Sequence, residues 1–178
     1  MAENRSDAPK SDGADPGAAD PAKAPQLRIL TQYVKDLSFE NPNAPSAITA
    51  NPEAPKIEAS VDVQAKKHGG SDFEVLLKIT VNAKRGENVA FIAELLYGGL
   101  FRLQNIPDEQ KQPVILIECP RQLFPFARRV IADTIRDGGY PPLLLDPIDF
   151  VALYQQQMRG RSTATEAKPR AQPAKTAQ

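Results

Sequence analysis

The sequence has few of the residues that metal sites and disulfide frameworks require. Its 178 residues include one cysteine, Cys119, and one histidine, His68. A single cysteine excludes an intramolecular disulfide framework and a cysteine-rich metal site, and a single histidine leaves no second imidazole for a histidine-based zinc site. We therefore expect neither a metal nor a cofactor.

Long hydrophobic runs and an excess of one charge are also absent. No apolar stretch approaches the roughly 20 residues that cross a bilayer, and the N-terminus lacks the apolar segment of a signal peptide. The sequence thus predicts a cytoplasmic protein without direct membrane insertion. Lys plus Arg and Asp plus Glu both number 22, and this balance gives no support to nucleic-acid binding.

Motifs of nucleotide-binding enzymes are missing as well, since the chain contains neither G-x-x-x-x-G-K-[ST] nor G-x-G-x-x-G. Cys119 stands at a helix start, where a lowered pKa could make it a nucleophile, but a small buried hydrophobic residue is the simpler interpretation. His68, the one candidate base for it, lies in a lysine-rich turn. We expect no enzymatic activity.

The sequence is rich in period-two alternation, the pattern of half-buried strands. In residues 27–40 the odd positions are mostly apolar and the even positions end in Asp36, Ser38 and Glu40. Three further segments alternate in the same way and are joined by two short turns, which predicts an antiparallel meander. The four expected strands span residues 27–40, 57–65, 73–82 and 89–97.

The clearest helical pattern runs from Cys119 to Gly139, with Pro120 suited to a first turn and Gly138-Gly139 suited to a stop. A shorter helix, capped by Asp146 or Asp149, should follow and reach about Met158. A proline-rich crossover that begins at Tyr140 joins the two. The expected fold class is α+β, a four-stranded antiparallel β-sheet with one long helix and a short C-terminal helix.

The segment before the long helix is less regular. Gly98-Gly99 is expected to end the fourth strand, and residues 100–103 form a short apolar piece after it. Pro107 favours a helix start that Pro113 interrupts, and the apolar run 114–117 favours helix packed just ahead of the long one. Compositional bias predicts disordered tails at residues 1–25 and 160–178, the second of them basic, around one domain at 26–159.

Two surface features stand out from the alternation. The fourth strand carries Ile92, Glu94 and Leu96 on the face that is polar in its neighbours, where they meet Asp36, Ser38 and Glu40, and this favours a contact with another protein over burial in the monomer. The crossover and last helix carry several large apolar groups, which suit either a groove for extended apolar peptide or a core covering. These residues are Tyr140, Leu143, Leu144, Phe150 and Tyr154.

Four segments resemble the SecB protein-export chaperones. They are Y-V-K-D-L-S-F-E-N-P-N-A-P at residues 33–45, G-G-L-F at 98–101, E-C-P-R-Q-L-F-P-F-A-R at 118–128 and G-x-Y-P-P-L-x-L at 138–145. The resemblance covers roughly residues 26–158 and implies a cytoplasmic homotetramer, a dimer of dimers, without nucleotide or metal. It implies that the protein binds unfolded secretory precursor proteins, keeps them competent for translocation and delivers them to SecA, the ATPase motor of the Sec pathway.

Carried over residue by residue, the resemblance places SecA docking on Asp36, Glu40, Ile92 and Glu94. It places the client groove along the main helix, the crossover and the last helix. The C-terminal tail departs from the family pattern, because it is basic where family members tend to be acidic, so a tail contact with the motor is in doubt. Two alternatives stay open: a SecB-like chaperone of a toxin–antitoxin system, and a structural oligomeric adaptor.

Overall fold

A computed structural model describes residues 24–49 and 54–166 of the chain, with side chains to residue 160. Its elements are long strands followed by helices, as the alternation and the helical periodicity predict. In chain order they are β1 (Gln26–Glu40), α1 (Ser46–Thr49), β2 (Lys56–Gly69), β3 (Asp72–Arg85), β4 (Asn88–Gln104), α2 (Asp108–Pro113), η2 (Val114–Glu118), α3 (Cys119–Asp137) and α4 (Phe150–Glu166). Most of the two tails expected to be disordered lies outside the described residues.

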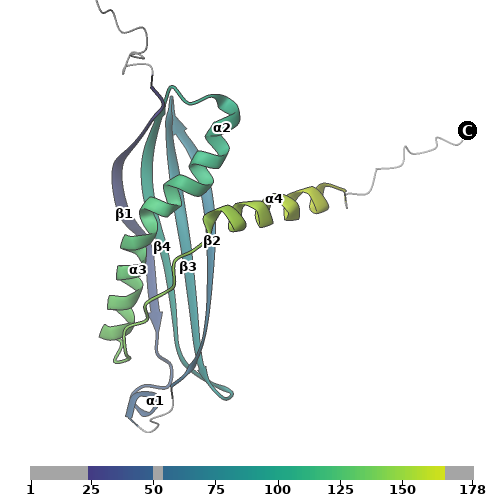
Figure 1. The fold of residues 1–178 in the computed structure, drawn as a ribbon. Coiled ribbons are helices and arrows are strands. Elements are labelled where there is room, and N and C mark those ends of the chain that lie inside the picture. The colour runs from purple at the N-terminus through teal and green to yellow at the C-terminus, as the bar shows by residue number, and fades with distance from the viewer. Residues whose placement is uncertain (1–23, 50–53, 167–178) are drawn as a thin grey trace, which may run out of the picture.

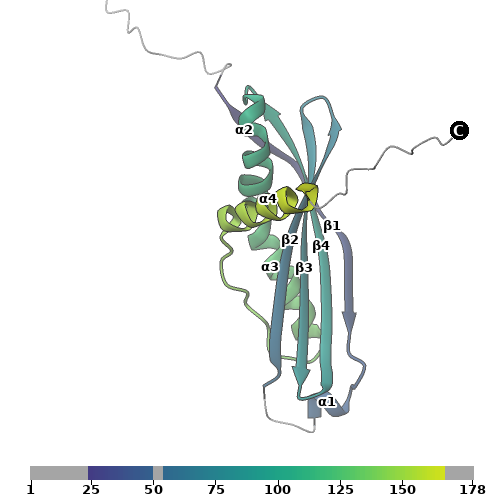
Figure 2. The same cartoon turned by 90° about the vertical axis from the view of Figure 1, so that its right-hand side faces the viewer.

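The strands form one antiparallel sheet in the order β1-β4-β3-β2, so the expected four-stranded sheet and meander are confirmed. Helices α2, η2 and α3 run as one oblique rod along a single face of the sheet, and α4 projects away from it (Figures 1 and 2). We call the helix-covered face the inner face and the opposite one the outer face. In the described part of the chain no helix covers the outer face.

The core lies between the inner face and α3. Along β3 and β4 every second residue points inward and is buried, without a break in the alternation. These residues pack against the apolar stripe of α3, whose members recur at helical spacing. Burial of this apolar surface is the main stabilising term of such a two-layer arrangement. The largest fully buried side chains include Phe91, Phe101, Leu123, Ile131 and Ile135.

The fourth strand is longer than expected, because β4 continues through Gly98-Gly99 to Gln104. The paired glycines sit where both neighbouring strands are hydrogen-bonded and both faces are crowded. A Cβ on Gly98 would come within 2.7 Å of the Tyr33 ring, and one on Gly99 within 2.7 Å of Leu123. The glycines therefore make room for the Tyr33 ring on one face of the sheet and for α3 on the other. The prediction that Gly98-Gly99 ends the fourth strand was wrong.

The helix expected at residues 114–117 is confirmed, but the interruption expected at Pro113 and the expected end of the last helix were wrong. Pro113 ends α2, but the rod continues through η2, a single wider π-turn between Pro113 and Pro120, two residues that cannot donate a backbone hydrogen bond. Helix α4 runs to Glu166 rather than to about Met158, so residues 160–166 of the expected tail are helical. No proline interrupts the chain between Phe150 and Pro169, so this extension is sterically allowed.

Candidate functional site

The first candidate surface is the acidic patch, which we define as Asp36, Ser38, Glu40, Ile92, Glu94 and Leu96. Strands β1 and β4 pair directly at these positions: Asp36 lies opposite Leu96, Ser38 opposite Glu94 and Glu40 opposite Ile92. Side chains of directly opposite residues share a face, so all six lie together on the outer face. Asp36 and Glu40 are about 13 Å apart along the strand at roughly 3.3 Å per residue.

The carboxylates of the acidic patch differ in their partners. The carboxylate of Glu94 lies 3.9 Å from the Lys78 ammonium, and the Thr80 hydroxyl is 3.5 Å from it. Asp36 and Glu40 are exposed, and within the described residues no salt bridge involves either of them. The negative charge that lacks a salt-bridge partner among the described residues is therefore concentrated on the β1 side of the patch.

On the outer face beside the patch, the negative charge of Glu74 is compensated by a polar network. Tyr33 and Lys35 both donate to the Glu74 carboxylate, with Lys35 at 2.6 Å. The Lys35 hydrogen bond, followed by that of Tyr33, lowers the pKa of Glu74, while burial and then Glu74 raise the pKa of Tyr33 to about 12. Arg102 and Asp72 form a further ion pair at 2.7 Å. These charges are satisfied inside the protomer and leave the acidic patch as the distinct feature.

The second candidate surface is the crossover between α3 and α4, and two of its expected client residues are core anchors. Tyr140 is buried, its hydroxyl lies 3.0 Å from the Ala90 carbonyl oxygen and its ring centroid lies 4.7 Å from that of Phe91. Phe150 is 1% exposed and packs edge-on against Phe124 at 6.1 Å between centroids. These contacts fasten both ends of the crossover to the sheet and to α3.

The other three expected client residues reach the surface. Leu144 is 65% exposed, and Leu143 and Tyr154 are partly buried. Leu143 also lines the crossover cleft, a predominantly apolar hollow of about 290 Å³ whose lining includes Ile57, Phe91, Tyr140 and Pro142. The crossover thus offers an open apolar surface beside a small apolar cleft.

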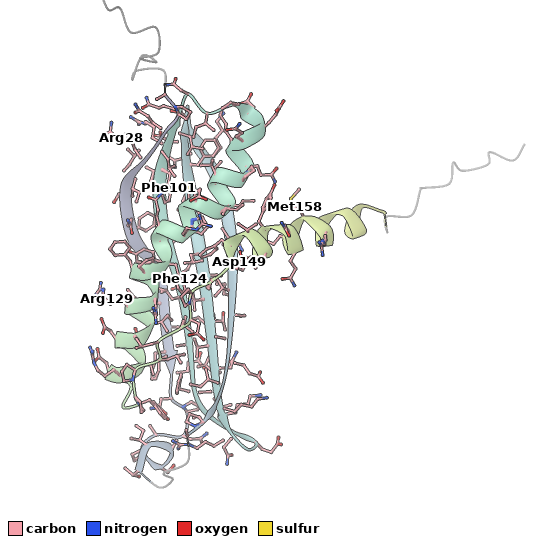
Figure 3. All side chains as sticks on the ribbon, in the orientation of Figure 1. Arg28, Phe101, Phe124, Arg129, Asp149 and Met158 are labelled. Atoms are coloured by element: carbon pink, nitrogen blue, oxygen red, sulfur yellow. The ribbon has the colours of Figure 1, made fainter. Side chains whose placement is uncertain are left out.

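Helix α4 is held at its base and projects beyond it, as the side-chain view shows around Asp149 and Met158 (Figure 3). The Asp149 carboxylate accepts from the Val151 and Ala152 backbone N–H groups at 2.9 and 3.0 Å, which makes it the N-cap. Farther along, the Gln157 amide donates to the Asp62 carboxylate at 2.9 Å. The helix is therefore fixed against the edge of β2.

Cys119 is fully buried, and burial raises the pKa of its thiol to about 12. A thiol of this kind is not a ready nucleophile at neutral pH, which agrees with its interpretation as a packing residue. Among the described residues no helix is long and apolar enough to cross a membrane.

One feature of the surface was missed from the sequence. Arg85, at the end of β3, lines both the crossover cleft and a neighbouring hollow of about 330 Å³ whose lining is mixed polar and apolar. A lone arginine near a turn carries no sequence signal of this kind, because the two hollows are built by segments far apart in the chain.

A comparison with solved structures identifies the fold that this arrangement defines. A SecB-like chaperone of Mycobacterium tuberculosis, solved with a ChAD peptide from the HigA1 antitoxin, matches 68% of this chain and 90% of its own at a TM-score of 0.53 and 17% identity. The likeness shows that the fold is that of the SecB-like chaperones.

Sequence comparisons narrow the class to one family. The family model of "Preprotein translocase subunit SecB" matches residues 20–161. The protein-export protein SecB of Parvibaculum lavamentivorans is 54% identical over 154 residues, 86% of this chain and 92% of the relative. That of Maricaulis maris is 55% identical over 143 residues, 80% and 83% of the two chains. The chain belongs to the SecB family.

Proposed function

We propose that this protein is an ATP-independent chaperone of the cytoplasm that binds unfolded precursor proteins, keeps them competent for translocation and delivers them to the SecA motor. Membership of the SecB family, whose curated relatives are protein-export proteins, is the single observation that carries the proposal. The exposed crossover and the acidic patch supply separate surfaces for client and motor, so both partners can be held at once.

Client binding uses the apolar surface of the crossover. Leu144 offers a side chain to water, and Leu143 stands at the crossover cleft beside it. Unfolded chains expose apolar side chains, and their burial on such a surface is favourable without sequence-specific contacts. The prolines of the crossover keep its backbone extended, which lowers the conformational entropy that a bound client would otherwise remove.

Motor docking uses the acidic patch. The exposed carboxylates of Asp36 and Glu40 steer a basic partner, and Leu96 and Ile92, which lie directly opposite them on β4, supply apolar contacts beside the charges. Exposed carboxylates that only solvate the sheet would each contribute little to binding. The proposal therefore predicts a salt-sensitive affinity that charge reversal removes.

Assembly into a homotetramer, a dimer of dimers, completes the proposal. The edge strand β1 presents large apolar side chains to water in the isolated protomer: Ile29, Leu30, Val34 and Leu37. A long apolar edge strand is a pairing hazard unless another chain covers it, so its burial between protomers is the natural outcome.

The function is tested by light scattering during refolding of a denatured secretory precursor, with and without the protein and without ATP. We expect suppressed aggregation at a protein excess. A structural adaptor would leave the scattering curve unchanged. The relationship to the mycobacterial chaperone is one of fold at 17% identity, so an antitoxin client is not favoured.

Docking is tested by calorimetric titration of SecA with Asp36→Arg and Glu40→Arg at two salt concentrations. Reversal of either charge should weaken binding about tenfold, because repulsion replaces attraction at a site that desolvates on contact. Glu109→Arg, an equal charge change on α2, is the matched control and should bind normally. Equal affinities for all four proteins would refute the docking assignment.

A further inference from the structure

A lysine stands next to the acidic patch, at a bulge of β1. The register passes from Val34 to Asp36 while β4 advances by a single residue, so Lys35 is an extra residue with no opposite position on β4. Consecutive residues of a regular strand point to opposite faces, but a bulge breaks this alternation. The side chains of Lys35 and Asp36 therefore both reach the outer face, although the two residues are neighbours in the chain.

Glu74 on β3 holds the Lys35 ammonium. The Lys35 Nζ atom lies 2.6 Å from the Glu74 Oε1 atom, and the Tyr33 hydroxyl donates to the same oxygen. The side chain of Glu74 is only 17% exposed, so water screens this ion pair less than a fully open one. The Tyr33 ring lies against Gly98 of β4, the strand between β1 and β3. The ammonium is thus drawn across β4 toward β3.

The position of Glu74 keeps the ammonium away from the acidic patch. Asp36 and Lys78 both lie opposite Leu96, and Glu74 stands four residues before Lys78 on β3. At roughly 3.3 Å per residue and 4.8 Å per strand spacing, the backbone positions of Glu74 and Asp36 are about 16 Å apart. This separation exceeds the Debye length of about 8 Å in physiological salt, so the Lys35–Glu74 pair leaves the charge of Asp36 largely unaltered.

We propose that Glu74 is a positioning residue of the docking surface, which holds the Lys35 ammonium away from Asp36 and so preserves the negative charge that a basic partner meets. Without Glu74, the flexible four-carbon stem of Lys35 lets the ammonium approach the neighbouring carboxylate. An ammonium beside Asp36 offsets its attraction for a basic partner and competes with the partner's cations for its oxygens. The inference rests on the proposed motor docking at the acidic patch.

The test is a double-mutant cycle read by calorimetric titration with SecA at two salt concentrations. The proteins are the wild type, Glu74→Gln, Lys35→Met and the double variant. Glu58→Gln is the matched control, because Glu58 is also a carboxylate of the outer face with a lysine partner, Lys56, at 2.9 Å. Glu58 lies in the same row of the sheet as Glu40, about 14 Å away across three strand spacings, and its loss releases a lysine at the far edge of the sheet.

We expect Glu74→Gln to weaken SecA binding about three- to fivefold and to reduce its salt dependence, and Glu58→Gln to change it less than about twofold. Lys35→Met alone should also change the affinity less than about twofold, because Glu74 already compensates that ammonium. In the Lys35→Met background, Glu74→Gln should no longer weaken binding, since no ammonium remains to be released. A simple effect of net charge would instead give the same loss from Glu74→Gln in both backgrounds.

Three results would overturn the proposal while leaving the docking assignment in place. One is an unchanged affinity of Glu74→Gln when Asp36→Arg does weaken binding, which would show that the released ammonium does not reach the patch. Another is an equal loss from Glu74→Gln with and without Lys35, which would assign the effect to net charge or to damage of the sheet. The third is a loss in Glu58→Gln as large as that in Glu74→Gln. Failure of the wild type to bind SecA would refute the docking assignment itself and this role with it.

Discussion

Alkaline pH provides a quantitative test of the packing around Cys119. Its thiol is fully buried at the start of α3, and burial raises its pKa from 9.0 to about 12. Because the folded-state pKa is the higher one, the stabilisation from this group is complete below pH 9. It is lost progressively as the pH rises from 9 toward 12, since the unfolded chain then releases a proton that the folded chain retains.

The magnitude follows from the two pKa values. At pH 8 the thiol is neutral in both states and contributes almost no pH dependence. At pH 10 it is mostly ionised in the unfolded chain and still neutral in the folded one, which lowers the free energy of unfolding by about 1.3 kcal/mol relative to pH 8. The value is insensitive to the folded-state pKa as long as that pKa lies well above 10.

The assay is urea unfolding of the wild type and of Cys119→Ala at pH 8 and pH 10, at one protein concentration and with a reductant present. The alanine variant is less stable at pH 8 because it leaves a small cavity. It should lose about 1.3 kcal/mol less than the wild type on going to pH 10. Tyr33, whose pKa is also raised to about 12, is present in both proteins, so its contribution cancels.

A stability difference between the two proteins that is the same at pH 8 and at pH 10 would refute the reasoning, because it would mean that the thiol ionises as freely in the folded chain as in the unfolded one. Alkylation provides an independent check. Iodoacetamide should react with the folded wild type at pH 8 much more slowly than with the urea-unfolded protein. Equal rates would show that the thiol is accessible.

Four further substitutions probe the fold and the proposed client surface. Gly98→Ala should lower the free energy of unfolding by about 1 to 2 kcal/mol in urea titrations, because the new Cβ meets the Tyr33 ring, and the loss should shrink in a Tyr33→Ala background. Asp149→Ala should cost about 1 kcal/mol of α4 stability, seen as faster amide exchange at the start of that helix, because two backbone N–H groups lose their acceptor. Leu144→Asp should weaken client binding in the scattering assay without changing the melting temperature, whereas Phe150→Asp should unfold the protein because that side chain is 1% exposed.

The regular part of the fold was predictable because two simple periods describe it. Strands β2 and β3 alternate cleanly, and α3 carries its apolar stripe at helical spacing, so the sheet and the long helix follow from side-chain direction alone. The acidic patch was placed on one face by the same rule, and the β1–β4 register pairs its members directly. Its docking role stays a prediction.

Alternation fails where the backbone departs from a regular pleat. Strand β1 has register shifts between Ile29 and Thr31 and between Val34 and Asp36, so the parity of its inward positions changes along the strand. Val34 therefore faces inward and Tyr33 outward, opposite to the simple odd–even rule. The Gly98-Gly99 pair was assigned as a strand end for a related reason: glycine signals both a turn and a close approach, and the ring of Tyr33 that decides between them lies 65 residues earlier in the chain.

The proposed client surface shows why composition alone cannot locate a binding site. A groove and a core both need large apolar residues, so Tyr140 and Phe150 could not be separated from Leu143 and Leu144 by type. Their difference lies in what the neighbouring segments supply: the rings of Phe91 and Phe124 pack against the first two, whereas Leu144 is 65% exposed. The same holds for Arg85, whose charge is ordinary in sequence and becomes distinctive because Ala47, on another loop, orients it between two hollows. A binding surface consists of the groups that packing leaves exposed. Only the packed structure shows which groups these are.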